Sequence, residues 1–321
     1  MKKQTKIWIA AASAMILIGI IIFGGVMSML NWDFKKLSTV QYETNRYEIN
    51  ETVENISIAL NTADLTFAPS EDGKLSVVCY EQSRGKHIVK AENGALTIQF
   101  ADTKAWYEHI GIDFQRAKIT VFLPAGEYGA LSVRSTTGHT EIPNDFQFKS
   151  MDISTTTGGV QNKASASENI RIHTTTGHIG IEGVNAASVA LSVSTGKINV
   201  TDTACETEIR IRVSTGDAKL TDVSCATLSS EGRTGDLLLK NVIASEKLEV
   251  RRSTGDVKLE GCDAGEIFVK TSTGKISGTL LSDKFFVCHS DTGSVRVPEN
   301  GDGGRCELST DTGNIGIEIL K

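Results

Sequence analysis

Two Asp-Thr-Gly triplets are the part of this sequence that most resembles a catalytic motif. They begin at Asp291 and Asp311, and the first continues into Ser294. An aspartic protease needs two carboxylates that share one proton at about 3 Å. Here both aspartates fall in a repeated column that elsewhere holds threonine, serine and one arginine. The triplets therefore indicate a structural repeat, and we predict no catalytic residues and no cofactor.

A second acidic feature is the column of Asp217, Asp236 and Asp256, each of which directly follows a glycine. Stacked carboxylates repel one another unless water, a cation or a neighbouring arginine compensates their charge. Arg233 and Arg252 lie close enough along the repeat to pair with them. The column is compatible with a solvated ridge, and also with a ridge that binds calcium or a surface ligand.

The six cysteines do not form a Cys-x-x-Cys motif, so the sequence predicts no metal site. Cys205 and Cys225 each follow a glycine by nine residues and should stack on one another. A spacing of about 5 Å between their Cα atoms permits a disulfide, but it also suits two buried thiols. Both alternatives remain open at this point.

One irregular segment, residues 101–116, concentrates aromatic side chains in a chain of which they make up only 6%. Loops carry binding residues more often than repeats do, so this segment is a candidate recognition loop. Its aromatic residues are equally suited to covering the open end of a β stack or to lying against a membrane. The four residues concerned are Trp106, Tyr107, His109 and Phe114.

A repeat must position all of these residues. Ten Thr-Gly pairs follow one another at intervals of 19 or 20 residues. A glycine that recurs so regularly indicates a tight turn with positive φ. The turn glycines are Gly138, Gly158, Gly177, Gly196, Gly216, Gly235, Gly255, Gly274, Gly293 and Gly313.

Apolar residues keep the same frame at seven and five positions before the glycine, and at two and four positions after it. This alternation predicts one short strand before the turn and one after it. A second turn column follows and includes Asp202, Asp222 and Asn241, and a short apolar pair after it suggests a third strand. The fold class is therefore all-β, a single-stack β-solenoid of about ten coils that forms a rod roughly 45 Å long.

The chain before the repeat, residues 40–124, contains less regular strands and should form an N-terminal β cap or degenerate coils. A solenoid needs such a cap because an open sheet edge recruits other strands. Residues 61–65 resemble an imperfect first copy of the turn, with Ala63 in the glycine slot. The repeat domain itself is expected to cover residues 125–321.

The N-terminal part of the chain has the pattern of a membrane anchor. Residues 7–30 form a stretch without a charged residue. This stretch is long enough for a helix that crosses the bilayer, and it is longer than the apolar region of a cleavable signal peptide. Lys2, Lys3 and Lys6 precede this stretch, so the positive-inside rule places residues 1–6 in the cytoplasm. Residues 31–39 then form a linker, and the bulk of the chain lies outside the cell membrane.

The overall charge excludes one class of partner. The chain has 33 Lys+Arg against 39 Asp+Glu, a net charge of −6, and it has no long basic run. A nucleic-acid-binding surface is normally a basic stripe, so we expect no nucleic acid partner.

The ladder of Thr-Gly turns resembles the candidate-adhesin, or toastrack, family of bacterial envelope β-strand-repeat proteins. The segment ITVFLPAGEYGALSVRSTTG at residues 119–138 and the leading apolar helix also match this family. The resemblance covers roughly residues 40–321 and implies no catalytic residues. Members of this family are often encoded with envelope-stress signalling membrane proteins in Gram-positive bacteria.

Three functions follow as hypotheses. The first is a non-enzymatic, membrane-anchored extracytoplasmic β-solenoid that acts in adhesion, scaffolding or sensing at the bacterial cell envelope, with the bilayer, an envelope polymer or a membrane signalling protein as partner. The second is an accessory subunit of an envelope-stress system that senses antibiotics. The third, an enzyme acting on polysaccharide, would need an acid and a base converging on one face, and the polar columns show no such group.

Overall fold

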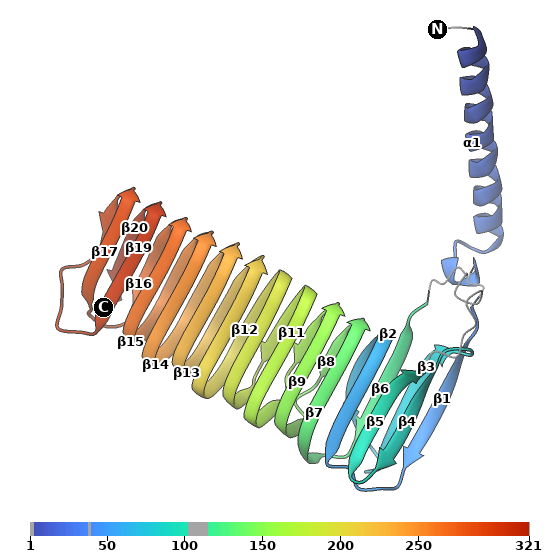
Figure 1. Ribbon diagram of the computed structural model, residues 1–321, viewed down its shortest axis with the longest axis horizontal. Coiled ribbons are helices and arrows are strands. Elements are labelled where there is room, and N and C mark those ends of the chain that lie inside the picture. Colours follow the sequence, from blue (N-terminus) through green and yellow to red (C-terminus); the bar gives the residue numbers. More distant parts are fainter. Residues whose placement is uncertain (1–2, 38–39, 102–114, 321) are drawn as a thin grey trace.

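The computed structural model describes residues 3–37, 40–101 and 115–320. Most of these residues form one long β stack (Figure 1). The N-terminal helix lies at one end of the molecule and the C-terminal coils lie at the other.

The N-terminal helix α1 (Lys3–Met29) is followed by a short 3-10 helix, η1 (Phe34–Leu37). Residues 4–29 of α1 contain a window with a mean hydropathy of 2.5, and none of that window is buried against the protein. The helix is therefore long and apolar enough to cross a membrane. Its isoleucine side chains are left without a protein partner, which is costly for them in water.

The first coil of the stack is β2 (Asn55–Pro69), which bends at the predicted imperfect turn. Thr62 pairs with Thr137 of β7 (Gly126–Thr137), and the carbonyl of Ala63 lies directly beneath Gly138. Ala63 therefore occupies the glycine slot, as the sequence predicts.

Five further strands close the end of the stack below β2. Two of them continue its parallel order and three pair antiparallel. β5 and β6 pair in parallel with the two halves of β2. β3 then pairs antiparallel with β6, and β1 pairs antiparallel with β3. On the other side, β4 pairs antiparallel with β5. Charged side chains on the outermost strand β1 make it a poor template for further pairing. The strands are β1 (Tyr42–Ile49), β3 (Leu75–Gln82), β4 (Lys86–Glu92), β5 (Ala95–Ala101) and β6 (Ala117–Leu123).

Beyond β2 the chain stacks in parallel, coil on coil, with each column of the repeat opposite its own copy. For example, Ile170 pairs with Val189, and Ile179 pairs with Ile198. The remaining strands of this part are β8 (Thr140–Ile142), β9 (Phe146–Thr157), β10 (Val160–Asn162), β11 (Ser165–Glu182), β12 (Asn185–Thr215), β13 (Ala218–Thr234), β14 (Leu237–Thr254), β15 (Val257–Thr273) and β16 (Ile276–Leu280).

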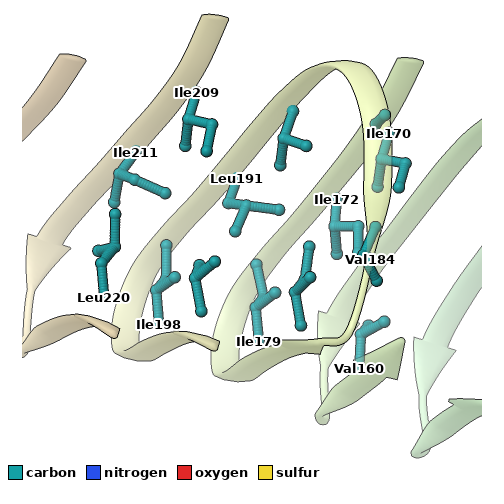
Figure 2. Close-up of a cluster of buried hydrophobic side chains, with 14 of the residues drawn as sticks. Val160, Ile170, Ile172, Ile179, Val184, Leu191, Ile198, Ile209, Ile211 and Leu220 are labelled. Atoms are coloured by element: carbon teal, nitrogen blue, oxygen red, sulfur yellow. The ribbon is translucent and has the colours of Figure 1, made fainter. Parts of the chain in front are cut away.

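The core lies inside the coils and consists of the predicted apolar columns. Leu191 and Ile198 lie on either side of one turn, and Ile211 and Leu220 lie on either side of the next. All four side chains are buried inside the coils (Figure 2). Each of these side chains also packs on its copy in the coils above and below. No coil can bury this surface alone, so the apolar columns hold the stack together.

The second turn column and the third strand are both confirmed. Asp202, Asp222 and Asn241 have φ values between 49° and 55°, a region that aspartate and asparagine tolerate better than most residues. The apolar pair that follows is buried and in register, with Val223 opposite Val242. Each regular coil thus has three straight segments, with the Thr-Gly turn between the first two.

The last two coils are stacked in an order that differs from their order in the sequence. Strands β19 and β20 pair directly with β15 and β16, and β17 and β18 then pair with β19 and β20. The final coil of the chain is therefore inserted one place before the end. A single stack predicts that each Thr-Gly turn lies directly on the turn before it in the sequence, and this is wrong for the last two coils. The strands are β17 (Phe285–Thr292), β18 (Val295–Arg296), β19 (Arg305–Thr312) and β20 (Ile315–Ile319).

Two local features make this exchange possible. Lys284 is buried where the chain skips one level, and its Nζ lies 2.7 Å from both Asp263 Oδ1 and the carbonyl oxygen of Ala264. The returning chain passes so close to other backbone at Gly303 and Gly304 that a Cβ atom at either position would overlap a carbonyl oxygen. Glycine is thus required at the crossing, and the buried ion pair fixes the skipped segment to the preceding coil.

Candidate functional site: the ridge beside the threonine-glycine turns

The ten turn glycines form one continuous column along the rod. Their φ values lie between 127° and 157°, and a Cβ atom at any of them would overlap a backbone carbonyl oxygen of the neighbouring coil. In most of these turns the overlapped group belongs to the turn glycine of that coil. The column therefore needs glycine for two reasons, which are the backbone conformation and the close approach of successive coils.

Hydroxyl groups reinforce this column from inside the coil. Thr174, Thr271 and Thr310 each stand three residues before a turn glycine and are completely buried. Each donates its hydroxyl hydrogen to the carbonyl oxygen of a turn glycine in the neighbouring coil, at 3.0–3.2 Å. These bonds satisfy backbone oxygens that the turn leaves without a sheet partner.

The predicted acidic ridge, Asp217, Asp236 and Asp256, lies directly beside the glycine column. The Oδ1 atom of Asp217 accepts a hydrogen bond from the backbone amide of Asp236 at 3.2 Å, and Oδ1 of Asp236 accepts one from the amide of Asp256 at 2.8 Å. The Oδ1 atom of Asp256 continues the series with the amide of Lys275 at 2.7 Å. Each aspartate thus binds the turn of the next coil.

Other residues of this column do the same. Asp64 accepts from the amide of His139 at 2.8 Å, and Nδ1 of His178 accepts from the amide of Lys197 at 3.2 Å. Within the described residues, the three ridge aspartates do not form a group whose donor atoms all lie within 4.8 Å of one another. The geometry therefore gives the ridge a structural role and favours the solvated ridge over a calcium site.

The cation beside the ridge is a lysine. Lys197 Nζ lies 3.1 Å from Asp217 Oδ2, whereas none of the ion pairs found in the described chain joins Arg233 or Arg252 to a ridge aspartate. The bond with Lys197 and the bond from the Asp236 amide hold the pKa of Asp217 below its ordinary value of 3.8. The ionised form is therefore favoured in the folded protein.

This shift predicts a difference in acid stability. A carboxyl group with a lowered pKa stabilises the fold fully above its unfolded value, and this contribution is lost as the pH falls through the folded value. An Asp217→Asn variant should therefore lose less stability than the parent protein as the pH falls below about 4. Thermal unfolding followed by circular dichroism at a series of pH values measures the difference. Parallel curves for the two proteins would contradict it.

The Asp-Thr-Gly triplets lie on the two exchanged coils. Ser290 pairs with Thr310, so Asp291 and Asp311 are on neighbouring strands, and both side chains are exposed. Asp291 Oδ1 accepts from Nε2 of His289 at 2.7 Å, on the open surface. Two solvated carboxylates do not share a proton in the way that a protease requires, so the triplets act as turns.

The remaining predicted residues have different outcomes. Trp106, Tyr107, His109 and Phe114 lie outside the described residues, so the recognition loop stays a prediction.

Cys205 and Cys225 are free thiols in the structure, as are the other four cysteines. The Cys205 thiol donates to the carbonyl oxygen of Ala187 at 3.1 Å, which is typical of a buried cysteine acting as a small apolar residue.

One buried charge was not foreseen. Arg252 takes the place of the inward threonine in its coil and is only 4% exposed. Its Nη2 donates to Ser230 Oγ at 2.9 Å, while Nε and Nη1 have no partner among the described atoms. Burial lowers the pKa of Arg252 to about 10, and the charges of Asp217 and Asp236 offset part of this effect.

The sequence did contain a signal for this arrangement. Ser230 interrupts an apolar column, and Gly232 interrupts the inward column one coil before Arg252. A Cβ atom at Gly232 would overlap Arg252 Nη1, so the glycine makes room for the guanidinium group. The three irregular residues are thus one coupled feature. It lies beneath a shallow depression of about 300 Å³, lined on the outside by Arg212, Arg233 and Arg251.

A double-mutant cycle tests this coupling. Gly232→Ala should destabilise the protein by about 1–3 kcal/mol while Arg252 is present, because the new methyl group displaces the guanidinium. In an Arg252→Thr background the same change should cost less than about 1 kcal/mol. Urea unfolding of the four proteins gives the interaction energy. Additive effects would show that Gly232 and Arg252 are independent.

Comparison with known proteins places this geometry in a family. A family model described as Toastrack DUF4097 matches residues 53–212 and 204–321. A search of curated proteins finds no match to the sequence.

Several solved structures are similar to this chain at low identity. A candidate adhesin from Parabacteroides merdae ATCC 43184 is 13% identical, with 73% of this chain and 95% of that chain covered and a TM-score of 0.49. A candidate lipid binding protein from Parabacteroides distasonis ATCC 8503 is 16% identical, with coverage of 75% and 95% and a TM-score of 0.44. A candidate adhesin from Bacteroides fragilis NCTC 9343 is 13% identical, with coverage of 87% and 97% and a TM-score of 0.40.

These identities concern the fold alone, and the family assignment comes from the family model. Its two matched segments together extend from residue 53 to residue 321, which includes the first coil, the cap apart from β1, and all ten Thr-Gly turns. The chain belongs to the Toastrack family.

Proposed function

We propose that this protein is a membrane-anchored, extracytoplasmic β-solenoid that acts without catalysis in adhesion, scaffolding or sensing at the bacterial cell envelope. The observation that carries the proposal is the combination of an unpartnered apolar helix at one end with a stiff rod of stacked coils (Figure 1). The helix would fix the protein to the bilayer through residues 7–30. The rod would then present its polar columns at a distance from the membrane surface.

The surface of the rod supports a binding role more than a catalytic one. Its polar residues recur in columns, so neighbouring coils offer similar groups at about 4.8 Å intervals, a spacing suited to a repetitive polymer. The carboxylates of the ridge are engaged in holding the turns, and those of the Asp-Thr-Gly triplets are open to solvent. Neither set provides the pair of differently tuned acids that hydrolysis of a polysaccharide needs.

Lysines on the N-terminal side of the helix support an orientation with the rod outside. In a Gram-positive cell the rod would face the cell wall. The partner would be an envelope polymer or a membrane protein, the latter as in an envelope-stress signalling system. The second case is the alternative that the experiment must separate from the first.

The experiment has two arms that use the same tagged protein. In the first, the full chain is purified from detergent-solubilised membranes and co-purifying proteins are identified by mass spectrometry. In the second, the full chain in micelles is mixed with insoluble cell-wall sacculi and sedimented. The proposal expects co-sedimentation with the sacculi, whereas a stoichiometric membrane protein without wall binding would favour the signalling subunit.

A matched control separates the rod from the helix. A protein in which only residues 31–321 are replaced by an unrelated soluble domain should neither sediment with sacculi nor retain a membrane partner that binds the rod. Release of soluble sugar from the sacculi by the parent protein would contradict the non-enzymatic assignment.

A further inference from the structure

Three side chains with metal-binding groups meet inside the cap, away from the ridge. Cys79 and Glu81 lie on the inward face of β3, two residues apart, and His87 lies near the start of β4. They are 0%, 0% and 3% exposed. The cysteine sulfur, one carboxylate oxygen and one ring nitrogen all lie within 4.8 Å of one another.

The hydrogen bonds in this cluster orient the histidine ring. Oε2 of Glu81 accepts from the ring Nδ1 of His87 at 2.6 Å and from its backbone amide at 2.7 Å. Oε1 of Glu81 accepts from the side-chain amide of Asn45 at 2.8 Å. The Glu81 carboxylate and the Nδ1 edge of His87 therefore face the same point, where an ion could take the place of the proton between them.

Two polar atoms of the cluster are left without a partner. Nε2 of His87 is buried and makes no hydrogen bond to the described atoms. The sulfur of Cys79 has none either in the described part of the chain, whereas the buried thiols of Cys205 and Cys262 both donate to backbone oxygens. A buried polar atom without a partner is uncommon in native proteins and needs an explanation.

The thiol of Cys79 would have to lose its proton to bind an ion. Burial and the nearby Glu81 carboxylate raise the pKa of the Cys79 thiol to about 12, so the thiol is neutral in the protein alone. A divalent cation would replace the thiol proton, and its two positive charges would balance one thiolate and one carboxylate.

We propose that Cys79, Glu81 and His87 bind one divalent transition-metal ion, and that zinc is the ion this set of donors favours. A sulfur, a nitrogen and an oxygen donor together are typical of zinc, with a fourth position left for water. In a tetrahedral zinc site with bonds of about 2.0–2.3 Å the donor atoms are about 3.3–3.8 Å apart. An ion bound by Cys79 Sγ, Glu81 and Nδ1 of His87 would therefore replace the present hydrogen bond between Glu81 and His87.

This site is independent of what the rod binds. It joins β3 to β4, and through them the antiparallel part of the cap to β5 and β6. A bound ion would therefore act as a cross-link in the cap of the stack and would raise its resistance to unfolding. The set has no paired-cysteine signature in the sequence, because its spacing is Cys-x-Glu followed by histidine six residues later.

Cobalt(II) is the probe that tests the proposal on the full chain in detergent micelles. After treatment with a chelator and dialysis, the protein should bind one equivalent of cobalt with a near-ultraviolet thiolate-to-cobalt band, and zinc should displace it. X-ray absorption of the zinc-loaded wild-type protein should show one sulfur at about 2.3 Å and lighter donors at about 2.0–2.1 Å. The spectroscopic result needs no variant, so it holds even if a substitution prevents folding.

Variants assign the donors. Cys79→Ser should abolish the thiolate band. His87→Gln should weaken zinc binding by about 100-fold or more, which exceeds the loss expected when a residue only hydrogen-bonds to a metal ligand. The matched controls are Cys262→Ser, which is equally buried, and His173→Gln, which lies on the exposed surface of the rod. Both controls should bind cobalt like the parent. Absence of bound metal, a shell without sulfur, or equal binding by all four variants would overturn the proposal and leave a buried Glu81–His87 pair.

Discussion

Replacing Gly196 with asparagine is expected to destabilise the stack by about 3–5 kcal/mol, among the largest effects of a single substitution. The new Cβ atom would overlap the carbonyl oxygen of Gly177 in the neighbouring coil. Relief of this overlap requires the two coils to separate, which breaks backbone hydrogen bonds and exposes the apolar columns. The φ value of Gly196, 147°, adds strain for any residue with a side chain.

The control is the same substitution in the second turn column. Gly183 has a φ value of 68° and no atom within 4 Å of an added Cβ. The equivalent residues in later coils include Asp202, Asp222 and Asn241, which already adopt this conformation. Gly183→Asn should therefore change the stability by less than about 1 kcal/mol.

Urea unfolding and hydrogen exchange of the two variants provide the measurement. Because each coil contacts only its neighbours, the loss in Gly196→Asn should be concentrated in the coils around residues 177–216. Equal losses in both variants would show that positive φ, and not the close approach of coils, determines the glycine column.

The second large effect concerns the helix. Aspartates in place of Ile16 and Ile20, near the middle of α1, should prevent insertion into the membrane. Each aspartate costs about 2.5–3.5 kcal/mol at the centre of a spanning helix, or about 5–7 kcal/mol together. The protein should then move from the membrane pellet to the soluble fraction after carbonate extraction.

A variant with the same change in charge serves as the control. Aspartates at Gln4 and Ser28, close to the two ends of α1, would lie in the interfacial region of the membrane. A charged side chain costs less free energy there than at the bilayer centre. This protein should stay in the membrane fraction. Retention of the Ile16 and Ile20 variant in the membrane would mean that the helix does not hold the protein there.

Much of the fold can be predicted from the sequence because the repeat constrains it strongly. Every coil has its apolar residues at the same offsets from the Thr-Gly pair, so a wrong register would expose a whole column. The slot of Ala63, the second turn at Asp222 and the third strand at Val223 were all predicted from this frame and are confirmed.

The exchange of the last two coils could not be predicted from the same frame. Gly293 and Gly313 keep the normal spacing, and their coils carry the same columns, so either coil fits on β15 and β16 equally well. What decides the order is local. The buried contact between Lys284 and Asp263 and the close crossing at Gly304 involve residues outside the repeated columns.

The side-chain clusters could not be predicted from the sequence either, but for a different reason. The role of the ridge aspartates depends on hydrogen bonds to the next coil, and the residue type at that position varies between aspartate and histidine. The pairing of Glu81 with His87 depends on which strands of the irregular cap are neighbours. The columns outside the core have weaker patterns because solvent tolerates many residue types there.

Labelling of intact cells tests the central claim, a rod held outside the cell by one helix, most directly. A membrane-impermeant amine reagent is applied to cells that express the full chain, and labelled lysines are mapped by mass spectrometry. The exposed lysines Lys219, Lys240 and Lys258 of the rod should be modified before lysis, while Lys6 should react only after lysis. Modification of Lys6 in intact cells, with the rod lysines protected until lysis, would contradict the account.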